Sequence, residues 1–326
     1  MRKILITVPM EPEHIQRLLE ICPDADISLV SGKELTREQV QGAEIIIGNV
    51  PPALIKGSEN LKWIQLNSAG TDGYTAPGVL PEGTILTNAT GAYGLAISEH
   101  MLGVTLQLMK KLNLYQREQE KHAWTDFGSV NSIEGSKTVV VGLGNIGGDY
   151  ARKMNALGSR VTGIRRSVFD KPDYLEKLCP LEQLKDCLKD ADIVAAALPG
   201  TKDTYHLFDK EMFAAMKEGA IFLNVGRGTA VDQDALKEAL DSGHLFGAGI
   251  DVTDPEPLPS EHPLWTARNL LITPHVSGSY HLRETLERII RISEDNLSRY
   301  LKGEELNNVV DFSTGYRDNK RYEAEN

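Results

Sequence analysis

A glycine-rich turn follows one of the β-branched runs of the chain. The sequence VVVGLGNIGGDY has the pattern GxGxxG, with glycines at positions Gly142, Gly144 and Gly147. In such a turn the first glycine permits the tight bend, the second lets the backbone approach a pyrophosphate, and the third lets the next helix pack closely on the strand. The amides near Asn145 and Ile146 would open a helix whose positive end favours phosphates. Its place between two predicted strands indicates a dinucleotide-binding site.

The second of these strands ends at Arg165, Arg166 and Ser167. An NAD-selective site would place a carboxylate here to hold both ribose hydroxyls. Arginine cannot accept those hydrogen bonds, whereas it can make charge-assisted contacts with a 2′-phosphate, with Arg166 and Ser167 as further donors. The alternative is that these are solvated arginines on a surface loop. We therefore expect NADP as the favoured cofactor and NAD as the alternative.

An arginine lies immediately after a later predicted strand, in the sequence NVGRGTAVD. Arg227 thus follows a strand's carboxyl end, where ligands of open α/β sheets bind. We expect Gly226 and Gly228 to leave its fork unobstructed. The paired donors of a guanidinium match the two oxygens of a small carboxylate. An arginine in a glycine turn is more often a structural contact, but this position makes Arg227 a candidate substrate ligand.

Three further candidates stand on turns after the next two predicted strands. The sequence GIDVTDPEPLPSEHPLWTARNLLITPHVSG carries Asp251, Glu256 and His275. Glu256 and His275 are 275 − 256 = 19 residues apart, and a loop plus a strand can bring them together. A carboxylate beside an imidazole orients the ring and favours its protonated form, which suits a general acid. We expect these loops to converge on the same edge of the sheet.

The composition is that of a globular protein with an acidic balance. The 326 residues include 35 basic and 46 acidic side chains, a net charge of −11, which argues against nucleic acid or an anionic membrane surface as the main partner. Three cysteines without CxxC spacing fit neither a disulfide framework nor a four-ligand zinc site. No cleavable signal peptide and no run of about 18 apolar residues is evident. We expect a cytoplasmic protein without a metal.

Short β-branched runs alternate with helix-like stretches, which is typical of βα units around a parallel sheet covered on both faces. The length indicates two domains. The stretch 279–302 has apolar residues at helical spacing, and if it packs on the first sheet, the first domain is discontinuous. We predict strands at 4–8, 27–30, 44–47, 63–66 and 85–87 in a first series, and at 138–141, 160–164, 193–198, 221–225, 247–252 and 270–272 in a second.

Together the motifs resemble the D-isomer-specific 2-hydroxyacid dehydrogenases, which include glyoxylate/hydroxypyruvate reductases and phosphoglycerate dehydrogenases. The resemblance covers nearly the whole chain, through NSAGTDGY, GLGNIG, ALPGT, NVGRG, GIDVTDPEPLP and TPHVSG. It implies an α/β protein of two doubly wound parallel-sheet domains. These would be a Rossmann dinucleotide-binding domain at 99–279 and a discontinuous, flavodoxin-like substrate domain at 1–98 and 280–326. It also implies hinges near residues 98 and 280 and a homodimer.

The resemblance implies a role for each strand-end candidate. Arg227 would hold the carboxylate and carbonyl of a small 2-oxo acid. Glu256 would support His275, and His275 would protonate the carbonyl oxygen as hydride arrives from NAD(P)H, giving the D-2-hydroxy acid. Asp251 would orient the nicotinamide carboxamide. The chain would thus be an oxidoreductase acting mainly as a reductase, with the side chain of its substrate left open.

Two more segments gain a role from the same resemblance. The loop Ser68, Ala69 and Gly70 would give backbone amides to the substrate carboxylate from the other domain, so that closure aligns the reactants and excludes water. Pro199, in ALPGT, would belong to the cofactor site. Tyr74 follows the carboxylate-binding turn and is a candidate for lining the pocket.

Two features depart from the commoner family pattern. Arg165 replaces the usual acidic residue, and because the sequence ends near residue 326 we expect none of the regulatory extensions of some phosphoglycerate dehydrogenases. Two other functions stay open. A cofactor-sensing interaction protein, as in the C-terminal-binding-protein corepressors of the family, would bind cofactor with negligible turnover. A formate dehydrogenase relative is the weaker alternative, because formate oxidation needs no protonation of an oxygen.

Overall fold

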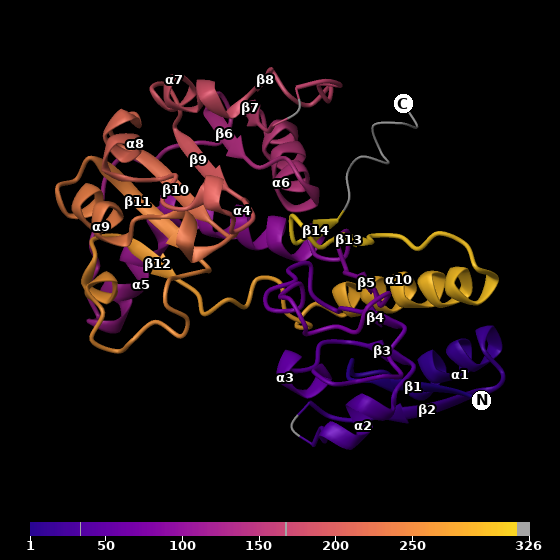
Figure 1. Ribbon diagram of the computed structural model, residues 1–326. Helices are drawn as coiled ribbons and strands as arrows, with labels where there is room; N and C mark the ends of the chain where they lie inside the picture. The colour runs from indigo at the N-terminus through magenta and orange to yellow at the C-terminus, as the bar shows by residue number, and fades with distance from the viewer. Residues whose placement is uncertain (33, 167, 318–326) are drawn as a thin grey trace. The chain divides into compact units, whose positions relative to one another are not determined.

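The computed structural model describes residues 1–32, 34–166 and 168–317, which form two compact units (Figure 1). Unit 1 runs from Met1 to Tyr93 and takes up the chain again from Tyr280 onward. Unit 2 runs from Gly94 to Ser279. Within the described ranges, no helix is both long and apolar enough to cross a membrane.

Unit 1 is built on a five-stranded sheet in the order β2-β1-β3-β4-β5, with every pairing parallel. This is the flavodoxin-like order, in which the chain reverses direction across the sheet between β1 and β3. The elements are β1 (Arg2–Ile6), α1 (Pro12–Ile21), β2 (Ala25–Leu29), α2 (Arg37–Gly42), β3 (Ile45–Ile47), α3 (Pro52–Ile55), β4 (Trp63–Gln65), β5 (Ile85–Thr87), α10 (Arg283–Lys302), β13 (Val310–Asp311) and β14 (Tyr316–Arg317).

Successive side chains of the unit 1 strands point to opposite faces of the sheet. Ile4 and Ile6 belong to an apolar cluster that includes side chains of α1 and α10. Leu5 and Ile46 belong to a second cluster, which includes side chains of α2 and α3. The sheet is therefore covered on both faces, as a doubly wound arrangement requires.

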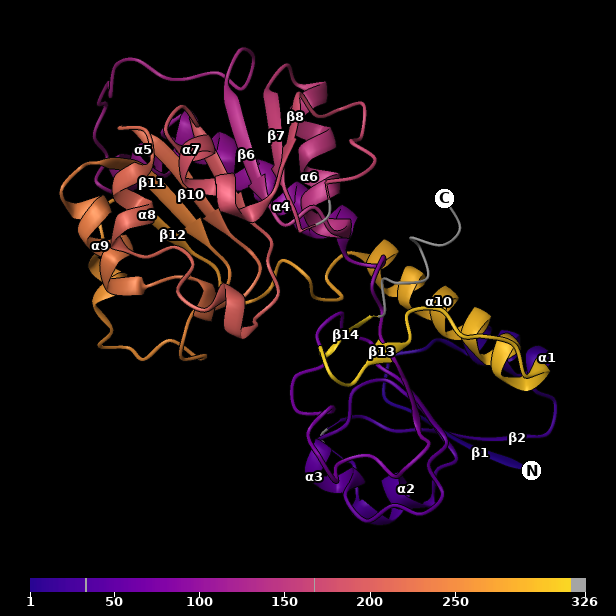
Figure 2. The same ribbon diagram turned by 45° about the horizontal axis from the view of Figure 1, so that its top comes forward.

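Helix α10, in the C-terminal segment of unit 1, lies beside α1, as both views show (Figures 1 and 2). His14 of α1 lies 3.1 Å from Glu287 of α10, and Arg17 donates to Glu294 at 2.7 Å. On its other side α10 reaches the sheet, where the buried Asn296 donates to Gln65 at 2.8 Å. These contacts join the two chain segments of unit 1.

Unit 2 contains a seven-stranded parallel sheet in the order β12-β11-β10-β9-β6-β7-β8. The six strands that come first along the chain, β6 to β11, follow the Rossmann order. The chain reverses direction across the sheet between β6 and β9. The elements are α4 (Gly94–Met109), α5 (Leu112–Glu120), β6 (Lys137–Val141), α6 (Asn145–Ala156), β7 (Arg160–Ile164), β8 (Lys177–Cys179), η1 (Leu181–Gln183), α7 (Leu184–Leu188), β9 (Ile193–Ala196), η2 (Lys202–Thr204), α8 (Lys210–Ala215), β10 (Ala220–Asn224), η3 (Gly228–Ala230), α9 (Gln233–Asp241), β11 (Leu245–Ile250), η4 (Pro263–Thr266) and β12 (Leu270–Ile272).

Helices also cover both faces of the unit 2 sheet. On one face, Val141, Val194 and Phe222 pack in a single core with side chains of α7, α8 and α9. On the other face α4 approaches so closely that a Cβ atom at Gly249 would lie 2.2 Å from a methyl group of Val104. The expectation of an α/β protein with two doubly wound parallel sheets is confirmed.

Candidate active site

The glycine turn after β6 has the geometry that a dinucleotide site needs. Gly142 has φ +97°, and a Cβ atom there would lie 2.6 Å from the Ala197 carbonyl oxygen. A Cβ atom at Gly147 would lie 1.9 Å from the Gly142 carbonyl oxygen, so only glycine fits there. At Gly144 a Cβ atom would meet nothing within 4 Å. The first and third glycines shape the turn, and the second leaves open space for a phosphate to approach, so the turn fits the cofactor.

Helix α6 begins in this turn, and its first amides are suited to an anion. Its N-cap residue, Gly144, supplies no side-chain hydrogen bond to the helix. The Asn145 side chain turns toward Gly94, since a Cβ atom there would lie 2.6 Å from Asn145 Oδ1. That oxygen is buried and has no hydrogen-bond partner in the described part of the chain. At Asn145 and Ile146 the backbone amides are therefore the groups available for a phosphate.

The loop after β9 lies on the other side of the point where strand order reverses. Pro199 is in this loop, and its carbonyl oxygen accepts a hydrogen bond of 2.6 Å from Thr204. A Cβ atom at the next residue, Gly200, would lie 3.1 Å from Cγ of Arg227. The Pro199 loop therefore packs against the stem of the predicted substrate ligand.

The loop after β7 is held together by Arg165. Its guanidinium Nη2 donates to the carbonyl oxygens of Phe169 and Asp170, the latter at 3.1 Å. Its amide donates to the Cys179 carbonyl oxygen at 3.2 Å. Arg166 is exposed, and Ser167 lies outside the described residues. Because a guanidinium has five N–H donors, this arrangement is compatible with a further anionic ligand.

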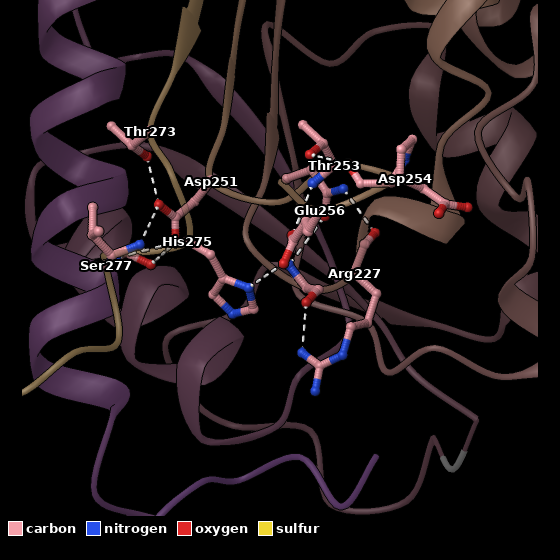
Figure 3. Close-up of polar contacts among 12 residues, drawn as sticks. Arg227, Asp251, Thr253, Asp254, Glu256, Thr273, His275 and Ser277 are labelled. Atoms are coloured by element: carbon pink, nitrogen blue, oxygen red, sulfur yellow. Dashed lines mark hydrogen bonds and ion pairs between the residues drawn. The ribbon is translucent and has the colours of Figure 1, made fainter. Parts of the chain in front are cut away.

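The predicted acid–base pair is formed. Nδ1 of His275 lies 2.8 Å from Oε2 of Glu256, and the side chains are 49% and 39% exposed (Figure 3). The other carboxylate oxygen, Oε1, accepts the amide of Thr253 at 3.0 Å. The carboxylate is thus held at both oxygens and fixes the imidazole through Nδ1. The second ring nitrogen, Nε2, is then the one that can meet a substrate oxygen.

Asp251 holds the turn that carries His275. The carboxylate is 2% exposed, and its Oδ1 accepts Thr273 Oγ1 at 2.5 Å and the Val276 amide at 3.0 Å. Its Oδ2 accepts the Ser277 amide at 3.1 Å and also the Ser277 hydroxyl (Figure 3). All four donors belong to the segment 273–277. Sequence reasoning missed this contact, although Thr273 and Ser277 stand symmetrically around the histidine in TPHVSG.

Arg227 is the third residue after β10, and its Nη1 donates to the Gly226 carbonyl oxygen at 2.9 Å. The flanking glycines, expected to leave its fork unobstructed, have a further reason to be glycine. A Cβ atom at Gly226 would lie 2.3 Å from the Leu198 carbonyl oxygen, and one at Gly228 would lie 2.0 Å from that of Thr253. Both glycines are required because neighbouring backbone segments pass close to them.

The loop of Ser68, Ala69 and Gly70 lies in unit 1 and begins three residues after the end of β4. All three carbonyl oxygens accept hydrogen bonds, from Ala89 at 2.9 Å, from Asn88 at 2.8 Å and from the Ser68 hydroxyl at 2.6 Å, respectively. Among the described residues, none accepts a hydrogen bond from the amides of Ala69 and Gly70. The loop therefore presents donors rather than acceptors.

Tyr74 is part of the unit 1 core. Its side chain is buried, and its hydroxyl donates to the Val50 carbonyl oxygen at 2.7 Å and accepts the Val50 amide at 3.0 Å. Burial raises the pKa of Tyr74 to about 12. Both bonds are internal, so this tyrosine supports the fold of unit 1.

Three neighbouring strands bring the catalytic candidates to one edge of the unit 2 sheet. Arg227 follows β10, Glu256 lies in the loop after β11, and His275 follows β12. Since these strands are adjacent and parallel, their carboxyl ends lie side by side. A guanidinium, a carboxylate and an imidazole at this edge can bind a small molecule by its carboxylate and exchange a proton with another of its oxygens.

The model of the family described as "D-isomer specific 2-hydroxyacid dehydrogenase, NAD binding domain" matches residues 102–277, more than half of the chain. The chain belongs to this dehydrogenase family. It is an NAD(P)-dependent oxidoreductase that transfers a hydride between the cofactor and a 2-oxo acid.

Relatives of this dehydrogenase extend the likeness to both units. The glyoxylate reductase/hydroxypyruvate reductase of Mus musculus is 31% identical over 253 residues, which are 75% of this chain and 75% of the relative. A D-isomer specific 2-hydroxyacid dehydrogenase family protein of Aeromonas salmonicida has a TM-score of 0.85 at 30% identity, covering 95% of this chain and 99% of that one. An NADPH-dependent glyoxylate/hydroxypyruvate reductase of Sinorhizobium meliloti, solved with NADP and sulfate, has a TM-score of 0.82 at 25% identity, covering 97% and 100%.

Proposed function

We propose that this dehydrogenase is an NADPH-dependent reductase of small 2-oxo acids of the glyoxylate and hydroxypyruvate type. The observation that carries the reaction is the hydrogen bond between His275 and Glu256 at the same sheet edge as Arg227. The cofactor preference rests on Arg165, which stands where an NAD-selective site has a carboxylate. Two relatives support the proposal. The one from Mus musculus is named for glyoxylate and hydroxypyruvate, and the one from Sinorhizobium meliloti was solved with NADP.

Each residue of the candidate site has its own role in the proposed reduction. Arg227 binds the substrate carboxylate and carbonyl with paired donors. Glu256 fixes the His275 ring through Nδ1, and His275 gives a proton from Nε2 to the carbonyl oxygen. When bound, NADPH supplies the hydride. Asp251 orients the nicotinamide side of the site, directly or through the His275 turn.

Each unit is assigned its own binding groups. Gly142, Gly144 and Gly147, with the amides of Asn145 and Ile146, hold the pyrophosphate, and Pro199 contacts the cofactor. Unit 2 is thus the cofactor domain. Unit 1 is the substrate domain, and the amides of Ser68, Ala69 and Gly70 bind the substrate carboxylate. Arg165, Arg166 and Ser167 bind the 2′-phosphate.

We also propose a cytoplasmic homodimer that binds neither nucleic acid nor membranes. All three cysteines are free thiols, which suits a reducing compartment. Trp124, just beyond α5, has a fully exposed side chain. An exposed tryptophan is a good anchor for a partner surface. Analytical ultracentrifugation of the wild type and of Trp124→Ser tests this: a dimer that the substitution weakens is expected, and a monomeric wild type would contradict it.

The deciding experiment is NADPH and NADH oxidation against glyoxylate, hydroxypyruvate, phenylpyruvate and branched-chain 2-oxo acids. We expect turnover with one of the two smallest acids and a higher kcat/KM with NADPH than with NADH. Arg165→Asp should reverse the cofactor ratio, while Arg160→Asp, at the exposed start of the same strand, should leave it unchanged. Tight cofactor binding without turnover on any acid would favour the cofactor-sensing alternative.

A further inference from the structure

Asn49 lies between β3 and α3, at the carboxyl end of the unit 1 sheet, and pairs with Asn67, which follows β4. The side-chain oxygen of Asn49 accepts the Asn67 amide at 3.0 Å, and that of Asn67 accepts the Asn49 amide at 2.6 Å. Because both donors are backbone amides, the two side-chain atoms that accept them must be the oxygens. The two asparagines therefore fasten the loop after β3 to the loop after β4.

The other end of the Asn49 side chain reaches the loop of Ser68, Ala69 and Gly70. Its Nδ2 donates to Ser68 Oγ at 3.0 Å. Ser68 Oγ lies 2.6 Å from the Gly70 carbonyl oxygen and 3.4 Å from Asn49 Oδ1, so its single proton goes to Gly70. The Ser68 side chain thus links Asn49 to the far end of the loop. No described residue accepts a hydrogen bond from the amides of Ala69 and Gly70.

The asparagine pair is itself held from two sides. Gly48 has φ +120°, and a Cβ atom there would lie 2.1 Å from Oγ1 of Thr7. This hydroxyl donates to the Asn49 carbonyl oxygen at 3.1 Å. On the other side, the hydroxyl of the buried Tyr93 donates to the Asn67 carbonyl oxygen. The network therefore has a fixed base at each of the two loops.

Burial of apolar surface does not account for Asn49, because its side chain is polar and the residue is exposed. Fixing an exposed side chain costs conformational entropy. Both side-chain hydrogen bonds of Asn49 lead to the segment from Asn67 to Gly70. Its contacts thus serve the loop that the proposed function assigns to the substrate carboxylate.

We propose that Asn49 is a positioning residue for the substrate, which acts through the Ser68 hydroxyl. It holds the loop in the form in which the amides of Ala69 and Gly70 meet the carboxylate. Groups that bind a substrate have to be held by neighbouring hydrogen bonds, since small displacements cost binding energy and rate. The inference rests on the proposed function, and it adds a residue that does not touch the substrate.

The first experiment compares wild type and Asn49→Ala in the reduction of glyoxylate by NADPH. We expect KM to rise roughly 3- to 10-fold, the effect of losing one hydrogen bond, while kcat changes less than about twofold. The Kd for NADPH should stay the same, because the proposed cofactor groups belong to unit 2. Oxamate has a similar carboxylate but accepts no hydride, and its Kd for the NADPH complex should rise by the same factor.

Asn60→Ala is the matched control. Asn60 is also an exposed asparagine of unit 1, and its Nδ2 donates to the Gln41 carbonyl oxygen at 3.1 Å. Its removal should change neither KM nor the Kd for oxamate. An Asn49→Ala protein with a lower Tm but unchanged KM and oxamate Kd would overturn the inference, because Asn49 would then only stabilise unit 1.

Ser68→Ala tests the route from Asn49 to the loop. This variant removes the same hydrogen bond from the other side, so its KM should rise by a similar factor. The double variant should be no worse than the single ones, since both break one connection. Effects that multiply would mean that Asn49 binds the substrate itself, which would overturn the inference. Ser68→Ala also decides the matter if Asn49→Ala does not fold.

Failure of the proposed function would be recognised separately. A wild type that reduces no 2-oxo acid would count against that function. Hydrogen exchange then tests the loop without turnover: Asn49→Ala should speed exchange of the amides in residues 66–71, and Asn60→Ala should not. Unchanged exchange in Asn49→Ala would overturn the role of Asn49 in holding the loop.

Discussion

Oδ1 of Asp251 lies 3.0 Å from the amide nitrogen of Val276, the residue that follows His275. His275 itself has φ +51°, a left-handed conformation that is uncommon for a residue with a side chain. Such a conformation persists only where the surroundings hold it. The His275 amide also donates to the Asp251 carbonyl oxygen at 2.8 Å. Asp251 therefore accepts hydrogen bonds from the backbone amides on both sides of the His275 side chain. A buried carboxylate thereby aims a partly exposed histidine.

We therefore expect Asp251→Asn to disturb the position of the His275 side chain more than the fold of the cofactor site. The amide group of asparagine would face the Ser277 donors or the Thr273 and Val276 donors, so hydrogen bonds are lost whichever way it turns. We expect a loss of about 1–3 kcal/mol in the free energy of unfolding and a fall in kcat on the order of 100-fold. Urea unfolding and steady-state kinetics measure both.

A companion titration separates the two roles of Asp251. If the carboxylate acts by holding the turn, the Kd for NADPH should change little, and Ser277→Ala should give a smaller decrease in kcat of the same kind. A large rise in Kd with kcat preserved would instead assign Asp251 mainly to the nicotinamide, as the family resemblance implies.

His275→Ala should abolish proton transfer without removing the cofactor. A positioned general acid contributes roughly 10²- to 10⁴-fold to the rate, and we expect kcat to fall by that factor. Glu256→Gln should have a smaller effect, since glutamine can still accept a hydrogen bond from Nδ1, although it carries no charge beside the ring. His122→Asn, a substitution of an exposed histidine with positive φ, is the control. Full activity of the His275 variant would show that another group supplies the proton.

Much of the site follows from the sequence because parallel strands end at a common edge. Every strand of the two parallel sheets except β8 was expected, so the placement of Arg227, Glu256 and His275 after β10, β11 and β12 followed from chain order. Strand β8 escaped because Lys177–Cys179 is only three residues long and partly exposed, and its conformation depends on pairing with β7.

Other features depend on contacts that no local pattern encodes. The clamp of Asp251 on the His275 turn joins side chains that are 22 to 26 positions apart. The close approach of Leu198 and Thr253 to Gly226 and Gly228 is visible only once three loops are placed together.

The contact between α1 and α10 should make unit 1 sensitive to acid. The hydrogen bond from His14, with the charges of His14, Arg17 and Arg283, holds the pKa of Glu287 below its usual value of 4.5. A carboxylate whose folded pKa is depressed contributes stability above its unfolded pKa and loses it as pH falls through the folded pKa. We expect Glu287→Gln to lower Tm at neutral pH, and we expect this difference to shrink as the pH falls below 4.5. A Tm difference that stays constant over this range would show that the charge of Glu287 is not what stabilises the helix pair.

The discontinuous construction of unit 1 depends most on Asn296. This residue is fully buried, and its amide donates to Gln65 Oε1 at 2.8 Å while its oxygen accepts the Asn307 amide at 2.7 Å. Asn296→Ala would leave the Asn307 amide without its partner inside the protein, where each unsatisfied buried group costs about 1–3 kcal/mol. We expect a lower urea midpoint and faster hydrogen exchange in β4 and α10, while the amides of β10 in unit 2 keep their protection. Arg291→Ala, on the exposed side of the same helix, is the matched control and should change neither quantity appreciably. Equal loss of protection in both units would mean that they unfold together, and that Asn296 stabilises more than the return of α10 to the first sheet.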